Sequence, residues 1–164
     1  MKKREVCSEC GSPIKWTRGD FDGTVLFGIP VTLLNIPIGR SDCGESPVIY
    51  RIEQVNRAIA RAVIRKPYRL TGAEIRFLRK FLQMKGEDFA KLIHVDRTTL
   101  SKWENDEDPV GDQSDRLIRA VALGLGGGLK DELEEGIRAF AKIKPTARKV
   151  RIELDPERLD VVPV

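Results

Sequence analysis

The spacing of hydrophobic residues changes along the chain, and each spacing predicts a different element. Residues 24–38 are β-branched and apolar, interrupted by one glycine and two prolines, which favours short strands in a hairpin or small sheet. From residue 48 onward, apolar positions recur every three or four residues, which predicts an amphipathic helix. Ser46 and Pro47 suit its N-cap and first position. It should end at Lys66, because the residue before a proline is pushed out of the helical region.

Several short helical patterns follow between residues 67 and 125. Their apolar residues form three groups, namely Ile75, Leu78, Phe81 and Leu82, then Phe89, Ala90, Leu92 and Ile93, then Leu100 and Trp103. Asp96 is a suitable N-cap for the third helix. Two short helices joined by a tight turn form a helix-turn-helix, whose second helix enters the DNA major groove.

Together these patterns predict an α+β chain in four parts. We expect a small cysteine-containing β-rich domain over residues 1–47, a linker helix over 48–66, an all-α helix-turn-helix domain over 67–125, and a C-terminal helix and tail over 126–164. A glycine-rich break at residues 124–128 precedes the last part. In the tail, charged and apolar residues alternate over 149–154, which favours a short strand.

Charge and hydropathy narrow the class of partner. No stretch approaches the roughly eighteen consecutive apolar residues of a membrane helix, and no signal-peptide pattern opens the chain, so we expect a cytoplasmic protein without a membrane partner. The net charge of +4 is unevenly distributed, since residues 48–105 contain 13 Lys and Arg against 6 Asp and Glu. This segment therefore suits a polyanion. The neutral N-terminal segment suits a protein partner instead.

All three cysteines fall in the N-terminal segment. Cys7 and Cys10 form a C-x-x-C pair, which is half of a zinc knuckle. A second pair is expected about thirty residues on, where Cys43 is present but Arg40 occupies its partner's position. Either zinc is held by the three cysteines and a fourth ligand such as Asp42 or water, or the site is degenerate and keeps its fold without metal. An odd number of cysteines in a cytoplasmic protein disfavours a disulfide framework.

At residues 78–79, 84–90 and 94–105, with Pro109 beyond, the chain resembles the Xre/Cro family of DNA-binding domains, most clearly in the stretch TLSKWEN at 99–105. The resemblance implies that Leu100 and Trp103 face the core and that Glu104 pairs with Arg79. It also implies a set of DNA-contacting residues: Lys85, Arg97, Thr98, Thr99, Ser101, Lys102 and Asn105.

Two positions depart from the family pattern. The family commonly has a glutamine that reaches DNA at the start of the second helix, where this chain has Gly86. A phosphate contact would then come from Lys85 or from a backbone amide at that helix terminus. The turn position often held by glycine is His94, a residue type that tolerates left-handed backbone angles better than most.

A cysteine module followed by a long helix and an Xre-type domain resembles the MqsA/YgiT-type antitoxins. That resemblance implies an N-terminal domain that binds and neutralises a small ribonuclease toxin, and a homodimeric DNA-binding domain that represses the toxin-antitoxin operon. The partners would be operator DNA, the cognate toxin and a second copy of the chain. An alternative is a stand-alone transcription regulator with a sensory N-terminal domain, and a third is an interaction adaptor with a vestigial helix-turn-helix. We find no catalytic Ser/His/Asp set or phosphate-binding glycine motif, so we do not expect an enzyme.

Overall fold

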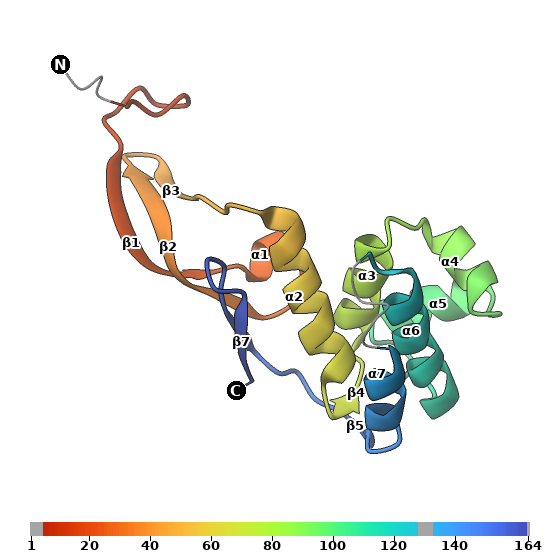
Figure 1. The fold of residues 1–164 in the computed structure, drawn as a ribbon. Coiled ribbons are helices and arrows are strands. Elements are labelled where there is room, and N and C mark those ends of the chain that lie inside the picture. The colour runs from red at the N-terminus through yellow and green to blue at the C-terminus, as the bar shows by residue number, and fades with distance from the viewer. Residues whose placement is uncertain (1–4, 128–132, 164) are drawn as a thin grey trace.

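The computed structural model describes residues 5–127 and 133–163. The chain combines a small sheet with several helices, at 42% helix and 24% strand, which confirms the expected mixture of the two (Figure 1). None of the helices within the described ranges is long and apolar enough to cross a membrane.

The N-terminal sheet is built on two long antiparallel strands. The strands and the short helix between them are β1 (Lys15–Asp22), α1 (Thr24–Phe27), β2 (Val31–Ser41) and β3 (Gly44–Pro47). Buried residues of β2 alternate, but the alternation shifts at Asn35, which has a positive φ of 50° and lies beside a register irregularity with β1. Two predictions are wrong here. Residues 24–27 form a helical turn, and Ser46 and Pro47 do not start a helix, because they pair with Gly39 and Ile38 of β2.

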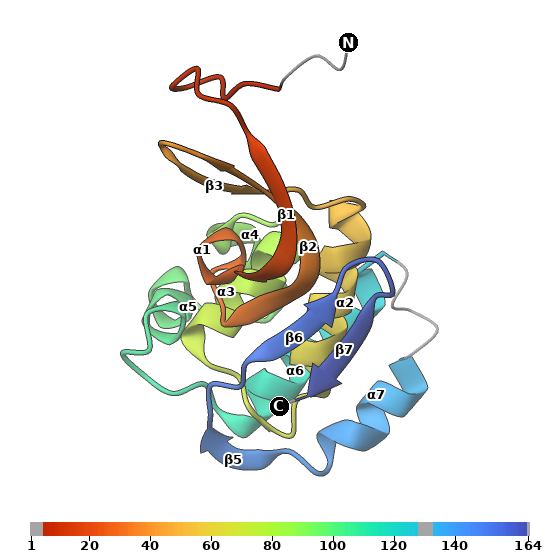
Figure 2. The ribbon, with the colours of Figure 1, turned by 90° about the vertical axis from the view of Figure 1, so that its left-hand side faces the viewer.

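The end of the chain completes this sheet. Strands β6 (Ile152–Asp155) and β7 (Asp160–Pro163) follow β2 in the order β1-β2-β6-β7 (Figure 2). β6 runs parallel to β2, with Val31 opposite Ile152. The expected strand near residues 149–154 is therefore present, and it joins the chain's two ends.

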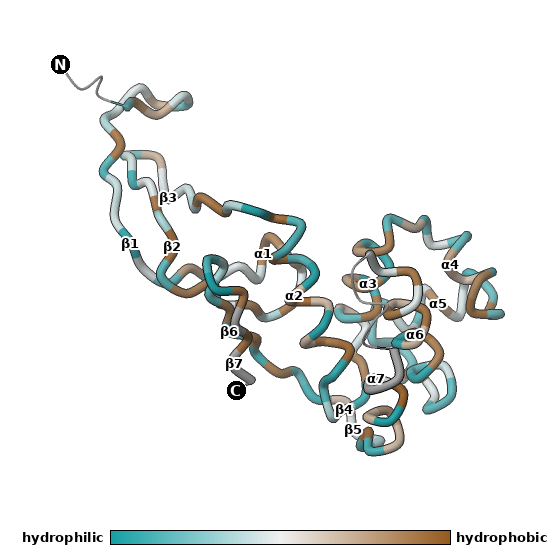
Figure 3. Tube along the Cα trace, in the orientation of Figure 1, coloured by the Kyte–Doolittle hydropathy of each residue, from teal (hydrophilic) through white to brown (hydrophobic). Residues whose placement is uncertain are grey.

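Helix α2 (Ile52–Arg65) lies between the sheet and the helices that follow it in the chain. Its N-cap is Arg51, five residues after the expected Ser46, with a left-handed φ of 58°, and the helix ends at Lys66 as expected. Its apolar and polar residues alternate along the tube of Figure 3 with helical periodicity. One face contacts β6 and β7 and another contacts α3, α6 and α7.

Helices dominate the remainder of the chain. In order, the elements are β4 (Tyr68–Arg69), α3 (Gly72–Phe81), α4 (Gly86–Leu92), α5 (Arg97–Glu104), α6 (Asp112–Leu125), α7 (Leu133–Phe140) and β5 (Lys144–Ala147). The three short helices expected before residue 105 are present. The glycine-rich break begins later than expected, because Gly124 lies inside α6, and its last residue, Gly128, lies outside the described ranges.

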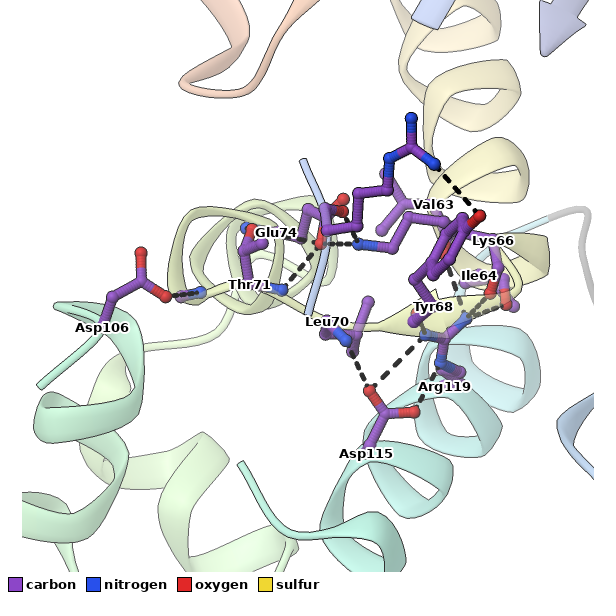
Figure 4. Close-up of polar contacts among 12 residues, drawn as sticks. Val63, Ile64, Lys66, Tyr68, Leu70, Thr71, Glu74, Asp106, Asp115 and Arg119 are labelled. Atoms are coloured by element: carbon purple, nitrogen blue, oxygen red, sulfur yellow. Dashed lines mark hydrogen bonds and ion pairs between the residues drawn. The ribbon is translucent and has the colours of Figure 1, made fainter. Parts of the chain in front are cut away.

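Arg119 of α6, which is buried and paired with Asp115 of the same helix, joins α6 to the end of α2. Arg119 is 0% exposed and donates from Nε to Asp115 Oδ2 at 2.7 Å (Figure 4). Its other donors bind backbone carbonyls at 2.6–3.3 Å, those of Val63, Ile64, Lys66 and Tyr68. Asp115 Oδ1 accepts from the amide of Leu70 at 2.7 Å. Because the last carbonyls of a helix lack intrahelical partners, Arg119 caps α2 from a different helix.

A second buried pair ties α2 to α3 and to the C-terminal segment. Lys66 Nζ donates to Glu74 Oε2 at 2.5 Å and to the carbonyl of Arg148 at 2.9 Å. Glu74 also accepts from the amide of Thr71, and together they form the capping box that starts α3. Burial lowers the pKa of Lys66, and the charge of Glu74 acts against that shift.

We expect Arg119→Met to destabilise the protein by about 3–5 kcal/mol, because it leaves Asp115 charged, buried and unpaired. The free energy of unfolding should be measured by urea denaturation monitored by circular dichroism. Arg116→Met on the exposed side of the same helix is the matched control, with an expected change within about 0.5 kcal/mol. Equal stability of the two variants would contradict the structural role of Arg119.

Candidate functional site

The three cysteines come together at the tip of the N-terminal hairpin. Cys7 and Cys10 lie on a tight turn in which the amide of Gly11 donates to the Cys7 carbonyl at 2.9 Å, with Gly11 in the left-handed region at φ 72°. Cys43 lies in the turn between β2 and β3, and its Sγ is 3.4 Å from Cys7 Sγ. The three Sγ atoms all lie within 4.8 Å of one another. A tetrahedral zinc with Zn–S bonds of about 2.3 Å sets its sulfur atoms about 3.8 Å apart, so the cluster fits such an ion.

The thiols influence one another's protonation. A hydrogen bond with Ser12 lowers the pKa of Cys10 to about 6, and backbone amides from Cys10 and Glu9 lower that of Cys7. A hydrogen bond with Ser41 acts to lower the pKa of Cys43, but hydrogen bonds with the other two cysteines outweigh it and raise the pKa to about 11. Thiolates are the form that binds metal.

Two carboxylates close in sequence to the cysteines, those of Asp42 and Glu9, are candidates for a fourth ligand, and neither belongs to the three clustered ligand atoms. The Asp42 amide donates to Ser12 Oγ at 3.0 Å. Glu9 Oε2 lies 3.8 Å from Cys43 Sγ. Sequence reasoning missed Glu9, although it stands between the two cysteines of the C-x-x-C pair. Arg40, in the position of the absent cysteine, pairs with Glu45 Oε1 at 2.6 Å, which offsets its positive charge.

The second candidate site is the turn between α4 and α5. Four residues join the helices, and His94 takes the left-handed conformation expected of it, at φ 56°. The Val95 amide donates to the Ala90 carbonyl at 3.0 Å. Asp96 is the N-cap of α5 as expected, accepting from the amide of Thr99 at 2.8 Å, and this contact together with the Thr99 hydroxyl lowers the pKa of Asp96.

The inner face of α5 is fixed by packing and by an ion pair. Leu100 and Trp103 are buried, as expected. Arg79 Nε donates to Glu104 Oε1 at 2.6 Å and Arg79 Nη2 donates to Glu104 Oε2 at 3.0 Å. The expected ion pair is therefore confirmed, and it is bidentate. Arg79 Nη1 also donates to the carbonyl of Met84, just before α4. One arginine of α3 thus holds both helices of the motif.

The residues expected to contact DNA fall into two groups. Exposed side chains are those of Lys85, Arg97, Thr98, Lys102 and Asn105, and partly buried ones are those of Thr99 and Ser101. Thr99 is engaged in the Asp96 cap, and Asn105 Oδ1 accepts from Arg76 Nη2 at 2.6 Å. Lys102 Nζ is 3.6 Å from Asp108 in an exposed pair. The side chains of Thr99 and Asn105 therefore have structural partners within the protein. Arg76, which the sequence analysis did not select, lies on the same surface through its bond to Asn105.

Gly86 makes room for Arg97 at the start of α4. A Cβ at Gly86 would lie only 2.9 Å from Arg97 Nε and 3.0 Å from Cζ, so the guanidinium occupies the space a side chain would need. The departure from the family pattern at residue 86 thus places Arg97, the first residue of α5, over the N-terminus of α4.

An acidic run, Asp106, Glu107 and Asp108, follows α5, and its first residue has a structural contact. Asp106 Oδ1 accepts from the amide of Gly72 at 2.6 Å, at the first turn of α3. A carboxylate at a helix N-terminus is stabilising. Its negative charge is therefore directed at a helix end.

Comparisons of the chain with protein-family models, curated proteins and solved structures gave no match. Function is therefore inferred from the geometry of the two sites and from the sequence resemblance.

Proposed function

We propose that this chain is a sequence-specific DNA-binding repressor that also acts as the antitoxin of a type II toxin-antitoxin system. The observation that carries the DNA-binding half is the two-sided character of α5. Its inner face is locked by Leu100, Trp103 and the Glu104–Arg79 pair, while Arg97, Thr98 and Lys102 are exposed. A rigid helix with exposed donors is the arrangement that base readout requires.

Each exposed residue has a chemical role on DNA. Arg97 and Lys102 can pair with guanine O6 and N7, and Thr98 can contact a thymine methyl group. Lys85, at the N-terminus of α4, suits a phosphate. Lys102 pairs with Asp108 in the free protein. Because an exposed ion pair stabilises by at most about 1 kcal/mol, a DNA group can replace Asp108 as the partner of Lys102.

A homodimer follows from the size of the reading surface. The eight residues of α5 reach few base pairs, and a second copy related by a two-fold axis doubles the site and fixes the half-site spacing. The operator should accordingly be palindromic.

The cysteine cluster supports zinc binding in the N-terminal half. Cys7, Cys10 and Cys43 would supply three thiolates and Glu9 the fourth ligand. A structural zinc fastens segments that lack a hydrophobic core of their own. Here it would join the N-terminal turn to the β2–β3 turn and give the toxin a firm surface to bind.

Lys102→Ala should weaken binding to DNA from upstream of the gene by about 1–3 kcal/mol and relax specificity at one base position. Fluorescence anisotropy with labelled duplexes, at two salt concentrations, measures both effects. Lys91→Ala is the matched control, since this exposed lysine of α4 pairs with Glu87 outside the proposed contact set. Unchanged affinity of the Lys102 variant would refute the assignment of α5.

Purified protein should bind about one zinc ion per chain, the stoichiometry of a single closed site. Inductively coupled plasma mass spectrometry gives the metal content, and competition with a chromophoric chelator gives the affinity. Cys43→Ser should abolish stoichiometric zinc, whereas Ser46→Ala in β3 should retain it. Glu9→Gln should weaken zinc binding if Glu9 is the fourth ligand, and unchanged affinity would assign that position to water.

The proposed antitoxin activity is tested by co-expressing the chain with the product of a small open reading frame beside its gene. We expect its product to co-purify with the chain and to stop growth when expressed alone. Lys102→Ala should keep this complex and Cys43→Ser should weaken it, because the two sites lie on separate elements. If no neighbouring product binds while DNA binding persists, the chain is a stand-alone regulator.

A further inference from the structure

The segment that follows α7 concentrates positive charge. Between residues 136 and 152 the sequence has six Lys and Arg residues and no Asp or Glu. Four of the six lie in β5 or within two residues of it, and all four are exposed. They are Lys142, Lys144, Arg148 and Lys149, and together they are called the β5 basic surface.

The charges of this surface have no acidic partner within the described part of the chain. The side chains of Lys142 and Lys149 form no ion pair or hydrogen bond there. Arg148 donates to a neutral group, the hydroxyl of Tyr68, at 3.2 Å. By contrast, the neighbouring Arg151 pairs with Asp22. The positive charge of the β5 basic surface is therefore available to an anion from outside the chain.

Tyr68 of β4 gathers two of the four cations. Lys144 Nζ lies 5.3 Å and Arg148 Cζ lies 5.4 Å from the centroid of its ring, the range of a cation–π contact. The backbone is held as well, because the Lys144 amide donates to the Pro67 carbonyl at 2.9 Å and the Arg148 carbonyl accepts from Lys66 Nζ. An anion near this ring would interact favourably with both cations at once.

The β5 basic surface is anchored to the helices of the proposed DNA-binding motif. β5 pairs with β4, and α3 begins three residues after β4 ends. The amide of Gly72 donates to Asp106, just after α5, and a Cβ at Gly72 would lie 2.2 Å from the Trp103 carbonyl oxygen, so α3 and the end of α5 are in close contact. In Figure 4, Tyr68, Thr71 and Asp106 follow one another along this path. The fold therefore fixes the position of the surface relative to α5.

We propose that the β5 basic surface binds the phosphate backbone of duplex DNA beside the bases that α5 reads. This inference rests on the proposed DNA binding and adds a sequence-independent contact to it. A duplex carries one negative charge per about 1.7 Å of its axis, so phosphates extend beyond any short run of bases. Duplex DNA is favoured over another polyanion because the surface is fixed to α5 through α3. Contacts to phosphate carry no base information, so they raise the affinity for every duplex alike.

The salt dependence of DNA binding tests the proposal on the full chain. Each phosphate contact adds about 0.9 to the slope of log affinity against log salt concentration. Lys142→Gln and Lys149→Gln combined should therefore lower that slope by about 2 and weaken binding about tenfold in about 0.1 M salt. Fluorescence anisotropy measures the effect with an upstream fragment and with an unrelated duplex, and both should lose affinity by the same factor.

Two matched variants separate phosphate contact from other effects. Lys142→Arg combined with Lys149→Arg keeps both charges and should bind as the unaltered chain does. Lys15→Gln combined with Lys91→Gln removes two other exposed lysines, one on β1 and one on α4, and should leave the slope unchanged. An unchanged slope in the Lys142–Lys149 glutamine variant, or an equal loss in the Lys15–Lys91 variant, would overturn the proposal.

The proposed function and this inference can fail separately. If Lys102→Ala keeps full affinity while the Lys142–Lys149 glutamine variant loses it, the surface binds phosphate and α5 does not read the operator. If the Lys102 variant loses affinity and the glutamine variant keeps its slope, α5 reads DNA and the β5 basic surface does not contact it. A loss seen with single-stranded RNA and not with duplex DNA would also contradict the inference.

Discussion

The last carbonyl groups of α2 need partners away from water, and Arg119 supplies them. A buried guanidinium costs several kcal/mol unless every donor is matched, and here its donors bind Asp115 and four carbonyls. Those carbonyls belong to the end of α2 and to the turn after it. Since few arrangements of α2 and α6 satisfy so many directional contacts at once, this network fixes how α2 meets α6.

The C-terminal segment connects the helices back to the N-terminal sheet. The carbonyl group of Arg148 in this segment accepts a hydrogen bond from Lys66 Nζ. Strand β5 of the segment pairs with β4, and strand β6 pairs with β2. The chain thus passes from sheet to helices and back to the sheet. Contacts of such large sequence separation hold α2 on both sides.

Local patterns predicted the helices well and the sheet poorly. The helical spacing and the Asp96 cap are contained in a short stretch of sequence, so α3, α4 and α5 could be placed. The pairing of Val31 with Ile152 depends on tertiary packing and has no local signature. Ser46 and Pro47 satisfy the rules for a helix start, yet strand pairing prevails there. The Thr71–Glu74 capping box and the Asp115–Arg119 spacing are visible in the sequence, but their burial is not.

The cysteine cluster and α5 lie at opposite ends of the molecule. In Figure 1 the N-terminal hairpin tip extends away from the helices, with the sheet and α2 between them. A metal at the tip contacts no residue of α3, α4 or α5, so its loading has no direct route to base readout. A partner bound at the hairpin tip likewise leaves α5 exposed. The proposed toxin-binding site and the proposed DNA-reading helix are therefore far enough apart for both to be occupied at once.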